Sequence, residues 1–181
     1  MGHLLSTDFD YESSKTSLSI LGDDNGYQHL WKEAEGSSAN GIAQVTWFGG
    51  LKFYTQTSAA NDNDQLIFAR PGANDPLFNL RNDQVLIHRK KDEKDVVYAS
   101  VIESHGSYST VTEIPQHPFG DISTVEVVYD DKNYTVIGFG DDKNNWKVFL
   151  CNEDASESST HSIEISNSVH TWEGPFKLIK E

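Results

Sequence analysis

The chain has 181 residues, a formal net charge of −14 at neutral pH and one cysteine, Cys151. This length suffices for one domain with a real core or for two small ones, and the acidic balance argues against nucleic acid as a partner, because little here could neutralise a row of phosphates. One cysteine excludes a disulfide within the chain, and no apolar stretch approaches a membrane-spanning helix in length, so we expect no membrane insertion.

In chain order, the N-terminal half predicts short strands between polar turns. Residues 4–11 and 16–21 are expected as strands, and the turn at 22–26 is rich in Gly, Asp and Asn. Residues 27–35 are ambiguous between a strand and one helical turn, and a strand is favoured. Residues 42–48 alternate, which places Ala43, Val45 and Trp47 on one face. Gly49 and Gly50 predict a two-residue connection, followed by strands at 51–57, 66–69 and 84–89.

The central stretch is residues 96–109. Residues 96–102 are almost wholly apolar or small and rich in β-branched and aromatic side chains, which favours a strand covered on both faces. Polar side chains then cluster around Gly106, which can supply the tight bend of a turn. A strand that ends in acid, imidazole, hydroxyl and phenol groups is where an all-β protein would place a site. It is also where one would simply end in satisfied polar side chains, and this second interpretation is favoured.

The last third predicts antiparallel strands joined by short turns. Strands of similar length are expected at 124–129, 134–139, 146–151 and 162–166, with one more at 172–179. No segment shows a sustained 3.6-residue period, an internal repeat or a linker. We therefore predict an all-β fold, an antiparallel β-sandwich, with residues 1–181 as a single domain.

Catalytic and metal-binding motifs are sparse. No two of the seven histidines have the HExxH or HxH spacing, and a single cysteine gives no zinc-finger framework, so we predict no metal site and no catalytic residue. Glu103, Ser104 and His105 offer the residue types of a relay, but neighbours on a strand point to opposite faces. The acidic turns at 22–26, 61–64, 130–133 and 140–145 could bind calcium, although ordinary turn chemistry is favoured, and no cofactor is expected.

Exposed rings could stack on sugar faces, and basic residues could bind an acidic polymer. The candidate rings are Tyr27, Trp31, Trp47, Trp146 and Trp172, although most rings of a sandwich are core. A local basic patch would have to come from Arg70, Arg81, His88, Arg89, Lys90 and Lys91. The predicted carbohydrate-binding set is Tyr27, His29, Trp31, Arg81, Glu103, His105 and Tyr108.

Seven segments spread over most of the chain carry a resemblance to a known family. They are residues 25–31 (NGYQHLW), 46–48 (TWF), 53–55 (FYT), 72–76 (GANDP), 78–81 (FNLR), 101–109 (VIESHGSYS) and 125–131 (VEVVYDD). Together they make the chain similar to the C-terminal β domain of heparinase II/III-like polysaccharide lyases, and most similar to the family 17 alginate lyases, the oligoalginate lyases.

The resemblance implies a parent protein with an (α/α) toroid followed by an antiparallel β domain. It places the catalytic Asn, His and Tyr residues, and the ligands of a structural zinc, outside this chain, which looks like a truncated β domain. The implied parent removes the C5 proton of a uronate and eliminates the 4-O-linked sugar, a reaction that needs charge neutralisation at the carboxylate and a base. We therefore expect this isolated chain not to be an enzyme.

Two functions from different classes follow. The first is a non-catalytic module that supports the structure or folding of the catalytic part. The second is a carbohydrate-binding module for alginate or a related uronate polymer, which the charge of −14 disfavours. Expected partners are the catalytic domain of the same parent, alginate oligosaccharide and a second copy of the chain. The resemblance implies a secreted or periplasmic bacterial protein, although the chain carries no signal peptide.

Overall fold

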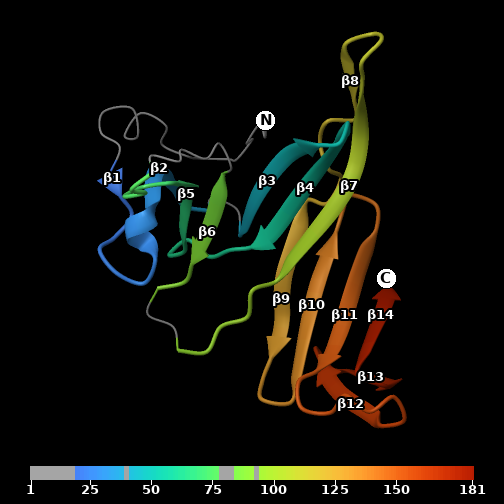
Figure 1. Cartoon of the computed structure of the whole chain (residues 1–181). Coiled ribbons are helices and arrows are strands. Elements are labelled where there is room, and N and C mark those ends of the chain that lie inside the picture. The colour runs from blue at the N-terminus through green and yellow to red at the C-terminus, as the bar shows by residue number, and fades with distance from the viewer. Residues whose placement is uncertain (1–18, 39–40, 78–83, 92–93) are drawn as a thin grey trace. The chain divides into compact units, whose positions relative to one another are not determined.

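The computed structural model describes residues 19–38, 41–77, 84–91 and 94–181 (Figure 1). They form two compact units, each built from two separate stretches of chain. Unit 1 comprises Met1–Phe48 and Ala60–Val96, and unit 2 comprises Gly49–Ala59 and Val97–Glu181. The predicted strand at 4–11 and most of that at 16–21 lie outside the described residues. That residues 1–181 act as a single domain stays a prediction.

Unit 1 is built on an antiparallel sheet in the order β1-β2-β5-β6. Its strands are β1 (Ser19–Ile20), β2 (Leu30–Gly36), β5 (Gln65–Pro71) and β6 (Val85–Arg89), and β3 (Ile42–Gly49) lies earlier in the chain than β5. The core of unit 1 combines buried side chains of the sheet, of β3 and of the segment after β4: Ala34, Ala43, Val45, Ala60, Leu66 and Phe68, with Trp47 and Leu86 packed against them. Ala43, Val45 and Trp47, which the alternation of residues 42–48 places on one face, lie together in this core.

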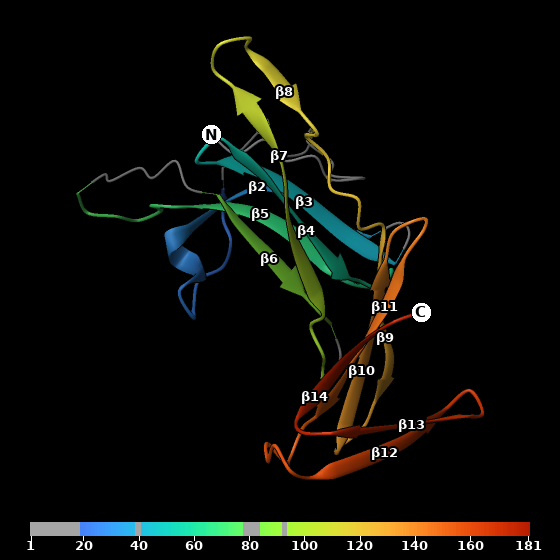
Figure 2. The same ribbon diagram turned by 90° about the vertical axis from the view of Figure 1, so that its right-hand side faces the viewer.

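Unit 2 contains two further antiparallel sheets and a hairpin. One sheet includes β4 (Lys52–Ala59), β7 (Ser100–Ser109) and β8 (Ile114–Gln116). The other has the order β14-β11-β10-β9, from β9 (Thr124–Asp130), β10 (Tyr134–Gly140), β11 (Asn145–Cys151) and β14 (Phe176–Lys180). The hairpin pairs β12 (Thr160–Ile165) with β13 (Ser168–Glu173). Figure 2 shows β9, β10 and β11 running side by side.

Both faces of the β9–β11 sheet are covered inside unit 2. On one face, Val136 and Phe149 pack with Ile163 and Trp172 of the β12–β13 hairpin. On the other, a second cluster joins Val125, Ile137 and Phe139 to residues of the β4–β7 sheet and of the segment before β9: Ala59, Ala99, Val101 and Ile122. Successive residues of a strand point to opposite faces, so β10 contributes Val136 to one core and Ile137 to the other. The expected all-β, antiparallel sandwich class is confirmed.

Several predicted elements differ from the structure. Residues 27–35 begin with a short 3-10 helix, η1 (Tyr27–His29), before β2 starts at Leu30. The connection between β3 and β4 is Gly50 and Leu51 rather than Gly49 and Gly50, and both have positive φ, +57° and +66°. The single final strand at 172–179 is two strands, β13 and β14, because Gly174 turns the chain with a φ of +86°.

The prediction for the central stretch was wrong in position and in burial. Residues 96–99 are not in a strand; β7 begins at Ser100 and continues through Gly106 to Ser109. Only one face of β7 is covered, since Ile102 remains 61% exposed. Gly106 is therefore not a terminal turn but a residue inside the strand.

Candidate functional site

The polar residues of β7 meet β4 and the segment before β9 around His105. The Nε2 atom of His105 lies 2.8 Å from the Thr55 hydroxyl oxygen, and its Nδ1 atom lies 2.8 Å from the carbonyl oxygen of His117. A carbonyl only accepts, so Nδ1 carries the proton, and in the neutral ring Nε2 accepts from Thr55. The His105 ring also stacks on Phe53 at a centroid distance of 6.3 Å. Both ring nitrogens are thus engaged in holding β4, β7 and His117 together.

Glu103, two residues before His105 on the same face of β7, fixes the same region. Its Oε2 atom accepts hydrogen bonds from the backbone N–H groups of Asp121 and Ile122, at 2.9 and 3.1 Å. Ser104, between Glu103 and His105, is exposed, whereas its two neighbours are half-buried. This alternation agrees with the prediction that adjacent residues of the strand do not form a relay. The geometry assigns Glu103 and His105 structural contacts.

Gly106 makes this arrangement possible. The register between β4 and β7 shifts at this point: Lys52 lies opposite Ser107 and Phe53 lies opposite His105, so Gly106 is the extra residue of a β-bulge. It has a φ of +51°, and a Cβ atom built on it would overlap the carbonyl oxygens of Gln116 and His117. Glycine is therefore required both by backbone conformation and by close approach.

In unit 1, the predicted Tyr27 and His29 lie on η1 and Trp31 lies on β2. The loop after β5 binds η1 through backbone groups: the N–H groups of Gly72 and Ala73 reach the carbonyl oxygen of His29 at 3.0 and 3.2 Å. The side chain of Asn74 donates to the carbonyl oxygen of Gln28 at 2.8 Å. Two of the segments that carry the family resemblance, 25–31 and 72–76, thus join each other as a structural contact.

The seven predicted carbohydrate-binding residues fall into groups. Tyr27, His29 and Trp31 share unit 1, Glu103, His105 and Tyr108 share β7 of unit 2, and Arg81 lies outside the described residues. Of the rings considered for sugar stacking, Trp47 packs against the unit 1 core and Trp172 is buried in unit 2, so for these two the core interpretation is correct. The Trp146 ring stacks on the Phe139 ring, and the Lys180 ammonium nitrogen lies 5.6 Å from the centre of the Trp146 ring.

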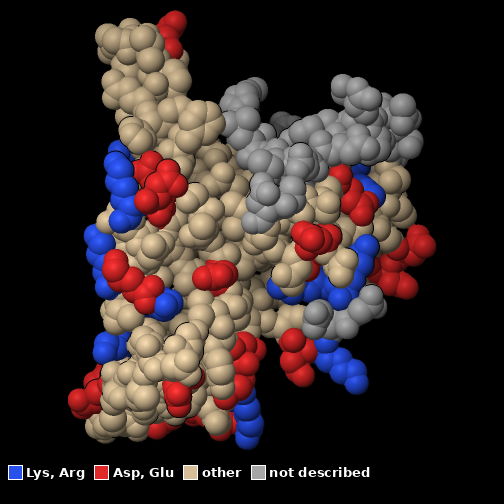
Figure 3. All heavy atoms as spheres, turned by 180° about the vertical axis from the view of Figure 1, so that it is seen from behind, with Lys and Arg blue, Asp and Glu red and all other residues tan. Residues whose placement is uncertain are grey.

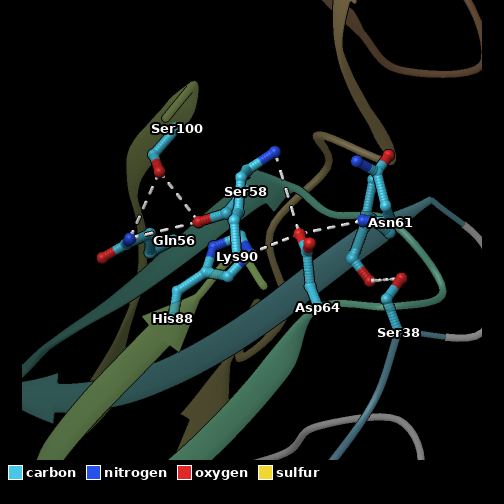
Figure 4. Close-up of polar contacts among 9 residues, drawn as sticks. Ser38, Gln56, Ser58, Asn61, Asp64, His88, Lys90 and Ser100 are labelled. Atoms are coloured by element: carbon cyan, nitrogen blue, oxygen red, sulfur yellow. Dashed lines mark hydrogen bonds and ion pairs between the residues drawn. The ribbon is translucent and has the colours of Figure 1, made fainter. Parts of the chain in front are cut away.

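Three basic residues of the predicted patch, Arg70, His88 and Lys90, contact acidic side chains within unit 1. The buried carboxylate of Asp64 accepts from the backbone N–H of Asn61 and lies 2.7 Å from the Nε2 atom of His88 and 3.8 Å from the ammonium of Lys90 (Figure 4). Arg70 forms an ion pair with Glu33. The sequence predicted His88 and Lys90 as part of a basic patch and Asp64 as part of an acidic turn, but not their pairing, because Asp64 lies more than 20 residues from them in the chain and no local pattern links them.

Arg89 is engaged in two ways. It donates a hydrogen bond to the Gln65 side chain at 3.1 Å, and its guanidinium carbon lies 5.1 Å from the centre of the Tyr27 ring. Asp64 and Glu33 therefore offset part of the positive charge of the predicted basic patch, which weakens the attraction of this surface for a polyanion.

In unit 2, Figure 4 also shows Ser58 and Ser100 bonded across β4 and β7, with hydroxyl oxygens 2.8 Å apart.

Two of the acidic turns use their carboxylates as turn caps. Asp131 accepts from the Tyr129 hydroxyl and from the backbone N–H groups of Asn133 and Tyr134. Asp141 accepts from the backbone N–H groups of Lys143 and Asn144, at 2.6 and 2.7 Å. The favoured interpretation, turn chemistry, is confirmed for these two turns. Among the residues that the structure describes, no group of three or more His, Cys, Asp or Glu side chains is placed to hold a metal ion.

The Asp141 cap makes a testable contribution to stability at low pH. Hydrogen bonds from the Lys143 backbone and the Asn144 side chain lower the pKa of Asp141 below its ordinary value. A group whose pKa is lower in the folded state stabilises the fold above its unfolded pKa, and this contribution is lost as the pH falls through the folded pKa. We therefore expect Asp141→Asn to reduce the loss of unfolding free energy between neutral and acidic pH. Urea denaturation across that range checks this, and parallel curves for the two proteins would contradict it.

The comparisons with known proteins agree on one kind of relative. The chain is 29% identical over 184 residues to an alginate lyase of Stenotrophomonas maltophilia, and 29% identical over 177 residues to an exo-oligoalginate lyase of Saccharophagus degradans. Each match covers 96% of this chain. This chain is homologous to part of the alginate lyases. The resemblance predicted from its sequence segments is confirmed, although no protein-family model matches the chain.

The match is very unequal in coverage. The chain spans only 23% of the Stenotrophomonas alginate lyase and 24% of the Saccharophagus enzyme. About three quarters of each alginate lyase therefore has no counterpart in this chain. Among the described residues, no helix is long and apolar enough to cross a membrane.

Proposed function

We propose that this chain is a non-catalytic C-terminal β-sandwich module of an alginate-lyase-like protein of the heparinase II/III-like kind, and that it supports the structure or folding of the catalytic part. The observation that carries the proposal is the coverage: nearly the whole chain matches about a quarter of two alginate lyases. The parent would be a lyase that cleaves alginate by β-elimination, secreted or periplasmic in a bacterium, and the isolated chain would not be an enzyme.

The contacts of the polar residues support a structural role. The ring nitrogens of His105 and the Oε2 atom of Glu103, the residues of β7 most suited to acid–base chemistry, are engaged by Thr55, His117, Asp121 and Ile122. A general base must reach a substrate proton, and these contacts instead direct both side chains at the protein itself.

Apolar side chains on the surface of unit 2 support the same role. Phe176 and Leu178 of β14 are exposed and lie opposite Leu150 and Val148 of β11, so they form an apolar stripe on one face of the sheet. Exposed apolar patches mark surfaces that bind other parts of a protein or other molecules. A supporting module would use such surfaces against the rest of its parent.

The second candidate, an alginate-binding module, is tested by calorimetric titration of the isolated chain with alginate oligomers. We expect no heat of binding, because a chain with a charge of −14 repels a polyanion. We also expect no growth of ultraviolet absorbance from an unsaturated product in the same sample. Binding without absorbance growth would favour the carbohydrate-binding module, and absorbance growth would contradict the proposal that the chain is non-catalytic.

The structural role is tested in a full-length chimera, in which this chain replaces the matching segment of the Stenotrophomonas alginate lyase. If the chain supports the catalytic part, the chimera should unfold in one cooperative transition and keep lyase activity. Two independent transitions, one of them equal to that of the isolated chain, would contradict the proposed function.

A further inference from the structure

The end of the β7–β8 hairpin extends beyond the strand that pairs with its base. The pairing of β4 with β7 ends where Lys52 lies opposite Ser107, whereas β7 continues to pair with β8, with Tyr108 opposite Pro115 and Ser109 opposite Ile114. We call residues 108–116 the arm. Figures 1 and 2 both show the arm projecting past the end of β4.

The arm carries two exposed apolar side chains and a single charged one. Val111 at its tip is 91% exposed and Ile114 is 58% exposed. Glu113 is the one charged residue among the nine residues 108–116. In Figure 3 the projection at the upper left is almost entirely tan, with red only near its tip. Exposed apolar side chains with little charge around them are typical of the centre of a protein–protein interface.

The base and the tip of the arm are held in defined geometry. At the base, the Gly106 bulge and the bond between His105 and the His117 carbonyl fix the direction in which the arm leaves the sheet. At the tip, the Glu113 N–H donates to the Ser109 carbonyl at 2.8 Å, and the Thr112 N–H donates to the Ser109 hydroxyl. A two-stranded hairpin is at best marginally stable in water by itself, and these contacts at the base and the tip hold the arm in a defined shape with Val111 and Ile114 exposed.

The net charge of this chain and the length of the homologous lyases together indicate which surface the arm contacts. A second copy of the chain carries the same charge of −14, and alginate is also a polyanion, so both are repelled at long range. About three quarters of each homologous lyase lies outside the region matched by this chain. A surface on the same polypeptide is present at a high effective concentration, which overcomes a repulsion that would prevent association between separate molecules.

We propose that the arm docks on the catalytic part of the parent polypeptide, with Val111 and Ile114 buried in the contact. This inference rests on the proposed function, because it requires a parent with a catalytic part. It deepens that function by naming the element that makes the contact.

The test compares hydrogen–deuterium exchange of the arm amides in the isolated chain and in the full-length chimera. Docking should slow the amide exchange of residues 108–116 in the chimera. In the chimera, Val111→Glu should raise this exchange rate by about tenfold, the factor that corresponds to the burial of one valine side chain. The matched control is Val169→Glu, the same substitution at a valine of unit 2 that is 69% exposed on β13. It should leave the exchange of the arm unchanged.

The outcomes separate this inference from the proposed function. A cooperative chimera in which the arm exchanges as fast as in the isolated chain, or in which Val111→Glu and Val169→Glu behave alike, overturns the arm and leaves the supporting module intact. Two independent unfolding transitions contradict the proposed function itself. Slow exchange in the isolated chain that depends on its concentration or on added alginate oligomers would assign the arm to a second copy or to the sugar, and would also overturn the inference. If Val111→Glu prevents folding of the chimera, Val111→Ser provides the same comparison without an added charge.

Discussion

Replacing Gly106 with alanine is expected to lower the unfolding free energy of the chain by about 3 kcal/mol, the sum of a forced overlap in a packed region and a left-handed backbone. The new Cβ would overlap the carbonyl oxygens of Gln116 and His117, and these are backbone atoms that cannot rotate away. Because His105 is bonded to that same His117 carbonyl, the substitution should also separate the segment around His117 from β7. Urea denaturation of the wild-type chain and the variant measures the loss.

Gly50→Ala is the matched control for this experiment. Gly50 also has a positive φ, +57°, but a Cβ built on it meets nothing within 4 Å. Its substitution therefore carries the conformational cost alone, about 1 kcal/mol. Equal losses for the two variants would show that the overlap at Gly106 is relieved by a small shift of the chain, and would remove the argument that the bulge requires glycine.

Replacing Phe149 with alanine should have an effect at least as large, about 3–5 kcal/mol, because it removes a large side chain from a closed core. Phe149 is 1% exposed, and its ring lies 5.5 Å from the Trp172 ring and 4.9 Å from the His170 ring. Tyr134 also contacts Trp172, at a ring distance of 5.5 Å. The cavity would thus open in the centre of the aromatic cluster that joins the β12–β13 hairpin to the β9–β11 sheet.

Phe176→Ala deletes the same side chain from the neighbouring strand, where it is 63% exposed. Because most of the Phe176 side chain is already exposed in the folded chain, its removal costs little buried apolar surface. We therefore expect the unfolding free energy to fall by no more than about 0.5 kcal/mol. Both variants are compared by urea denaturation of the isolated chain. A loss at Phe176 as large as that at Phe149 would mean that the side chain is covered in solution, and would contradict its assignment to an open apolar stripe.

The sequence predicted strands well where the turn chemistry was local. Residues 124–129, 134–139 and 146–151 are close to β9, β10 and β11, because polar turns such as 130–133 are closed by their own Asp side chains. The sequence predicts a single strand over 172–179, where the structure has β13 and β14. Gly174 followed by Pro175 is a local turn signal that indicates this break. The central strand was misplaced because an apolar composition cannot show which residues find a partner, and β7 is positioned by its pairing with β4.

The contacts around His105 were less accessible to sequence reasoning. His105 was singled out from its neighbours in the chain, but its partner Thr55 is 50 residues away and the other partner is a backbone carbonyl. No residue pattern marks a carbonyl as an acceptor. Likewise, the pairing of His88 and Lys90 with Asp64 depends on the register between β5 and β6, which places Leu66 opposite His88. Two basic residues that the sequence offered to an acidic polymer instead contact an acid brought close by strand pairing.

The interleaving of the two units sets an order of events during synthesis on the ribosome. The β4 strand belongs to unit 2 but is made before Ala60–Val96 of unit 1, and its partner β7 emerges only after that stretch. Translation therefore completes unit 1 first, while β4 waits with an unpaired edge that nascent chains or chaperones can reach. For the same reason no single cut in the gene separates the two units, and a truncation after Val96 would leave β4 permanently without β7.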